Sequence, residues 1–128
     1  MRTFLKYNIR AILWGVFIIV LTVLPGQVLP GIPVFLDLFK PDKLIHVFIF
    51  GVYVILQIRG FSRQDVFPFA NKYAVALTIL IAMLLSAGTE FLQACCIPMR
   101  NGNVFDFMAN TAGCAAGWAV YFFSLKKS

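Results

Sequence analysis

The chain has 128 residues, enough for one domain, and its composition excludes a soluble enzyme. Hydrophobic residues make up 61% of it and charged residues 12%, whereas a soluble domain is about one half apolar and about one quarter charged. A chain this small could not bury so much apolar surface in water. The net charge of +6 therefore favours basic residues that flank membrane spans over a nucleic-acid partner.

Four apolar stretches predict an all-α protein, because a membrane-spanning helix needs about 20 mainly apolar residues. They cover residues 9–24, 44–58, 73–96 and 104–125, and Pro and Gly residues separate them. We predict one domain over residues 1–128, folded as a four-helix transmembrane bundle. The first stretch has Arg2, Lys6 and Arg10 at or before its start, as a signal peptide would. No A-x-A-like cleavage site comes after it, so we expect an uncleaved first helix.

The basic residues lie mainly on one side of this topology. The N-terminus, the middle connection and the C-terminus carry eight of the 11 Lys and Arg residues. These are Arg2, Lys6, Arg10, Arg59, Arg63, Lys72, Lys126 and Lys127, and the other side carries Lys40, Lys43 and Arg100. The distribution predicts that both termini are cytoplasmic. The connection over residues 25–40 contains an apolar stretch, and the sequence leaves open whether it is interfacial or re-entrant.

Three of the stretches each carry a helix face with polar residues, and Lys43, His46, Glu90, Gln93, Asp106 and Asn110 all fall toward the predicted outer side. The first set is Lys43, His46, Phe50, Tyr53 and Gln57, the second is Ser86, Glu90 and Gln93, and the third is Asp106, Asn110, Gly113 and Gly117. Residues three and four apart share one helix face. A charge at mid-membrane costs roughly 2.5–3.5 kcal/mol, so Glu90 is expected to face protein. Gly113 and Gly117 predict a close approach of a neighbouring helix.

Each feature taken alone also has a purely structural explanation. Lys43 or Arg100 could extend its charged group to the interface, and Asp106 could complement a helix dipole. Glu90 and Gln93 inside an apolar run, with the titratable His46 at the same level, favour a ligand-binding or catalytic site. The cysteines Cys95, Cys96 and Cys114 lack metal-site spacing. We read them as small apolar packing residues and expect no metal and no cofactor.

The order of these motifs resembles the VanZ-like family of small bacterial membrane proteins, named after a member associated with teicoplanin resistance. The resemblance covers residues 41–117 and rests on Asp42-Lys43-x-x-His46, Glu90-x-x-Gln93, Arg100 and Asp106-x-x-x-Asn110-x-x-Gly113. It implies four helices in a bacterial cytoplasmic membrane. The family often has Tyr where this chain has Phe50, and Tyr53 could supply the missing hydroxyl.

Two interpretations of the site follow. In the first, an outward-facing site binds an anionic or zwitterionic cell-envelope ligand, such as a membrane lipid or a lipid-linked envelope precursor, and thereby affects glycopeptide sensitivity. The predicted ligand-binding residues are Lys43, His46, Glu90, Gln93, Arg100, Asp106 and Asn110. In the second, an intramembrane hydrolase or transferase uses Glu90, His46 and Asp106 as its candidate catalytic groups. A transporter and a scaffold are weaker alternatives, and an oligomer is compatible with the sequence.

Overall fold

The computed structural model describes residues 1–23, 41–96 and 104–125, and these residues form helices without a β-strand. The elements are α1 (Arg2–Val23), α2 (Pro41–Arg63), α3 (Pro68–Lys72), α4 (Ala74–Cys95), α5 (Val104–Val120) and a π-helical turn, η3 (Tyr121–Leu125). Three segments are long and apolar enough to cross a membrane: Arg2–Val23, Lys43–Arg63 and Ala74–Cys95. The 17-residue α5 is not one of these three.

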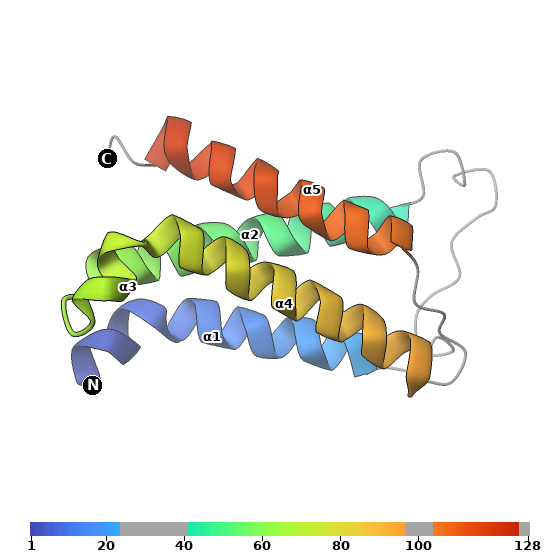
Figure 1. Ribbon diagram of the computed structural model, residues 1–128, viewed down its shortest axis with the longest axis horizontal. Helices are drawn as coiled ribbons and strands as arrows, with labels where there is room; N and C mark the ends of the chain where they lie inside the picture. The colour runs from blue at the N-terminus through green and yellow to red at the C-terminus, as the bar shows by residue number, and fades with distance from the viewer. Residues whose placement is uncertain (24–40, 97–103, 126–128) are drawn as a thin grey trace.

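The four long helices run side by side, and α2 contacts each of the other three, α5 most extensively (Figure 1). We call the end that holds Arg2 and α3 the near end. The far end is the one where α2 and α5 begin and α4 stops (Figure 1). The polar starts of α2 and α5 therefore lie at the same end of the molecule as the end of α4.

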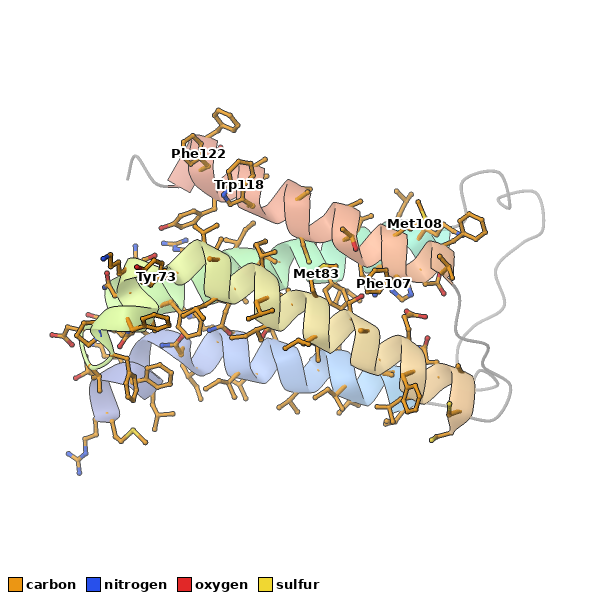
Figure 2. All side chains as sticks on the ribbon, in the orientation of Figure 1. Tyr73, Met83, Phe107, Met108, Trp118 and Phe122 are labelled. Carbon is orange, nitrogen blue, oxygen red and sulfur yellow. The ribbon has the colours of Figure 1, made fainter. Side chains whose placement is uncertain are left out.

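Large apolar side chains cover much of the outer surface. Leu84 and Phe91 of α4 are 64% and 67% exposed, whereas Val54 and Ile58 of the central α2 are fully buried. Such a surface is what contact with lipid requires. Tyr73, Trp118 and Phe122 lie toward the near end (Figure 2), and Trp and Tyr are enriched at membrane–water interfaces.

The short helix α3 was not predicted, because Pro68 was read as a helix breaker. Pro68 instead stands in the first turn of α3, where its missing N–H costs nothing. Gln64, which is fully buried, holds the turn before it. Its Nε2 donates to the carbonyl oxygen of Phe67 at 3.0 Å, and its Oε1 accepts from the Phe67 N–H at 2.8 Å.

Glycines let α2 and α5 approach backbone to backbone, as the Gly113-xxx-Gly117 spacing predicts. A Cβ added at Gly113 would lie 2.5 Å from the carbonyl oxygen of Val47. A Cβ at Gly117 would collide with the carbonyl oxygen of Gly51. Only residues without a side chain allow this contact, and it sets the distance across which His46 and Asn110 face each other.

Candidate functional site

A chain of hydrogen bonds joins three helices in the far half of the molecule. The Nδ1 atom of His46 on α2 lies 2.7 Å from Oδ1 of Asn110 on α5, and Asn110 Nδ2 donates to Oγ of Ser86 on α4 at 2.8 Å. Asn110 and Ser86 are fully buried. At a rise of about 1.5 Å per residue, His46 and Asn110 lie about 8 to 9 Å inside the starts of their helices.

The amide of Asn110 orients the imidazole ring of His46. Its Nδ2 faces Ser86, so its Oδ1 faces the imidazole. Because an amide oxygen only accepts, His46 Nδ1 donates in this contact. The neighbouring amide thus orients the histidine ring, as occurs where an imidazole works as a base or a ligand.

The α5 side of the site carries a buried acid beside a cation. Asp106 lies in the first turn of α5, is 9% exposed, and stands one turn before Asn110 on the same face. Its negative charge complements the positive end of the helix dipole. Lys43 Nζ lies 5.0 Å from the ring centroid of the neighbouring Phe105, which puts the ammonium at the same end of α5.

The α4 side supplies a carboxylate and an amide from the face that holds Ser86. Gln93 is 5% exposed. Glu90 is half-buried, and its Oε1 atom is shielded from solvent, so this carboxylate faces protein as predicted. Thr89 Oγ1 donates to the carbonyl oxygen of Ser86 at 2.9 Å, which satisfies its hydroxyl within α4.

The predicted residues therefore converge only in part. His46 and Asn110 are in direct contact, and Lys43, Glu90, Gln93 and Asp106 come from the far halves of the same three helices. Arg100 and the 25–40 connection lie outside the described residues. Ser86 was absent from the predicted ligand-binding set, although its position four residues before Glu90 on one helix face was the signal that could have added it.

The sequence also predicted roles for Tyr53 and for the three cysteines. Phe50 and Tyr53 both lie in the apolar core with Val54 and Ile58, and a role for the Tyr53 hydroxyl stays a prediction. Cys114 is also in this core, as expected of a small packing residue. Cys95 and Cys96 are exposed at the end of α4, so the same interpretation is wrong for these two.

Comparison with known proteins gives one match. The model of the family described as VanZ/LLP1 matches residues 5–125, which includes the first helix as well as all the candidate site residues. Neither a curated protein nor a solved structure matches the chain significantly.

Proposed function

The chain belongs to the VanZ/LLP1 family of proteins, and from this premise we propose that it binds an anionic or zwitterionic cell-envelope ligand at the far end of its helices. The observation that carries the proposal is the buried chain from His46 through Asn110 to Ser86. Ser and Asn side chains also hydrogen-bond across membrane helices as packing contacts, so the proposal rests on the titratable His46 within this hydrogen-bond chain and on Glu90 and Asp106 from the same helices. Ionisable residues at membrane depth are expected where a ligand or ion binds.

The charged residues around these hydrogen bonds indicate the class of ligand. Lys43, together with Arg100 from the connection between α4 and α5, offers positive groups to a phosphate or carboxylate, and Arg can bind such a group through two parallel hydrogen bonds. Glu90 and Asp106 would bind the amine of a zwitterion. Membrane lipids and lipid-linked envelope precursors carry both kinds of group, and binding them would change glycopeptide sensitivity, teicoplanin included.

The proposal includes a topology. The chain crosses a bacterial cytoplasmic membrane four times, with α5 and η3 together as the fourth span. The near end, with its Lys and Arg residues, is cytoplasmic, and the site opens toward the outside. A lipid-linked ligand could then enter laterally from the outer leaflet.

A binding experiment tests the function. The full-length protein in nanodiscs would be titrated with lipid-linked peptidoglycan precursor, zwitterionic phospholipid and teicoplanin. We expect saturable binding of at least one of them, weakened at least tenfold by Glu90→Gln. Thr111→Val is the matched control, because Thr111 is exposed one position beyond Asn110. Equal binding by the wild type, Glu90→Gln and Thr111→Val would refute the proposal.

An intramembrane hydrolase or transferase acting on a lipid-linked envelope substrate is the second candidate. The oriented imidazole favours it, because the ring of His46 is fixed by Asn110 and Glu90 and Asp106 come from the same end of the helix bundle as further candidate acid–base groups. Ser86 argues against a serine nucleophile, since its oxygen is fully buried and already accepts a bond from Asn110. Product formation during the same titration, abolished by His46→Gln, would replace the binding proposal with this one.

A further inference from the structure

Four basic side chains surround one pocket at the near end, between α1 and α2. The pocket has a volume of about 230 Å³ and is lined by Lys6, Tyr7, Arg10, Leu56, Arg59 and Arg63. None of these six residues is acidic. The pocket is separate from the candidate site, because Arg59 follows His46 on α2 by a distance of about 20 Å at 1.5 Å per residue.

Local packing forces these charges together. Lys6 and Arg10 are four residues apart on α1, as are Arg59 and Arg63 on α2, so each pair shares a helix face. Gly60 allows the two helices to touch, since a Cβ there would collide with Oδ1 of Asn8.

Asn8 also ties the two helices together through its side chain. Gln57 Nε2 donates to the Asn8 Oδ1 atom at 3.2 Å, while Asn8 Nδ2 donates to the carbonyl oxygen of Phe4 at 3.0 Å. Asn8 is 1% exposed, so this contact is internal and fixes the spacing of the basic pairs.

Four cations held around one pocket repel one another unless an anion lies between them. Basic residues that served only to orient the protein in the membrane would not need to converge, since the orientation rule counts charges on a side and does not require a shared pocket. The convergence across two helices therefore suits an anion. Arg10, Arg59 and Arg63 present the planar donors that suit a phosphate.

An apolar groove continues from the pocket along the same two helices. It has a volume of about 470 Å³ and is lined by Arg10, Leu13, Trp14, Phe17 and Leu56, so Arg10 and Leu56 belong to both. Trp14 is held in place because its Nε1 donates to the carbonyl oxygen of Ile49 at 2.9 Å. A cationic pocket joined to an apolar groove matches a molecule with a phosphate head and a hydrocarbon tail.

We propose that the near end binds an anionic phospholipid, with its phosphate between Arg10, Arg59 and Arg63 and one acyl chain along Leu13, Trp14 and Phe17. Basic pockets between membrane helices have the chemistry that such headgroups require. The bound lipid relieves the repulsion among the four cations and links α1 to α2.

Native mass spectrometry of the detergent-purified full-length chain tests this. The probes are phosphatidylglycerol, phosphatidylcholine with the same acyl chains, and inorganic phosphate. We expect phosphatidylglycerol to bind at least tenfold more tightly than either of the others. Arg10→Gln with Arg59→Gln should weaken it about 25-fold, at about fivefold per basic group. Arg2→Gln with Lys72→Gln removes the same charge outside the pocket and should change it less than threefold.

Three results would overturn the proposal. Equal binding of the two lipids would mean that the groove alone acts, and equal binding of inorganic phosphate would reduce the pocket to an anion site. An equal loss in the control pair would mean that only net charge matters. Thermal melting without lipid separates loss of binding from loss of folding. The weakening caused by Arg10→Gln with Arg59→Gln should be the same with and without Asn110→Ala, so failure of this proposal is distinguishable from failure of the far-end function.

Discussion

His46 and Asn110, 64 positions apart in the chain, meet at 2.7 Å between Nδ1 and Oδ1, and this contact joins α2 to α5 at the candidate site. The bond depends on the glycine contact below it, since Gly113 lies one turn from Asn110 and touches the backbone of Val47. Site chemistry and helix packing are therefore coupled within a single turn of each helix.

Replacing Asn110 tests the chain of hydrogen bonds that joins α2, α4 and α5. Asn110→Ala removes one hydrogen-bond partner of His46 and one of Ser86 and should lower the free energy of unfolding by about 1–3 kcal/mol, while abolishing ligand binding. Denaturation in mixed micelles measures the first effect and titration the second. Thr111→Val should stay within about 0.5 kcal/mol of the wild type. An Asn110→Ala variant that is fully stable and still binds ligand would show that the hydrogen bonds from His46 through Asn110 to Ser86 are dispensable.

Replacing Gly113 tests the close approach of α2 and α5. Gly113→Ala places a methyl group 2.5 Å from a backbone oxygen, which cannot move aside as a side chain can. We expect a loss of about 1–3 kcal/mol and weaker ligand binding. Gly88→Ala is the control, because a Cβ there meets nothing within 4 Å, and it should be neutral or slightly stabilising. Equal effects of the two substitutions would contradict the packing argument.

The near end is predicted to be cytoplasmic. Asp65 is exposed between α2 and α3, so Asp65→Cys in an otherwise cysteine-free variant should react with a membrane-impermeant maleimide only after permeabilisation. The distribution of Lys and Arg residues is the physical reason. Labelling in intact cells would contradict this topology and would mean that the candidate site lies on the cytoplasmic side.

Glu90, Arg100 and Asp106 are predicted to act as one charged unit. Two carboxylates at a similar depth repel each other, and a guanidinium between them relieves the repulsion. Arg100→Ala should therefore impair function strongly, and Arg100→Lys should restore it in part, because Lys lacks the planar fork. A resistance assay at matched expression measures this. If Arg100→Ala keeps its function and stability while Glu90→Gln loses function, the three residues do not form a unit.

The sequence alone determined the helical class and the depth of the polar residues. Hydropathy predicted the helices because a run of about 20 apolar residues in lipid must make all its backbone hydrogen bonds within itself. The helix bounds in the structure differ from the predicted apolar stretches mainly at their polar ends, since α1 begins at Arg2 and α2 continues to Arg63. Charged residues there belong to the helix but not to its apolar part, so an apolar window misses them.

Helical spacing also placed Ser86 and Glu90 on one face, and Asp106 and Asn110 on another, because the period of 3.6 residues is a local property. It could not say which faces meet. Only the tertiary structure decided that Asn110 bonds to both His46 and Ser86, since these contacts depend on how closely glycine lets α5 approach α2. The near-end pocket likewise needed packing, because two basic pairs about 50 residues apart become one site only when Gly60 and Asn8 bring their helices together.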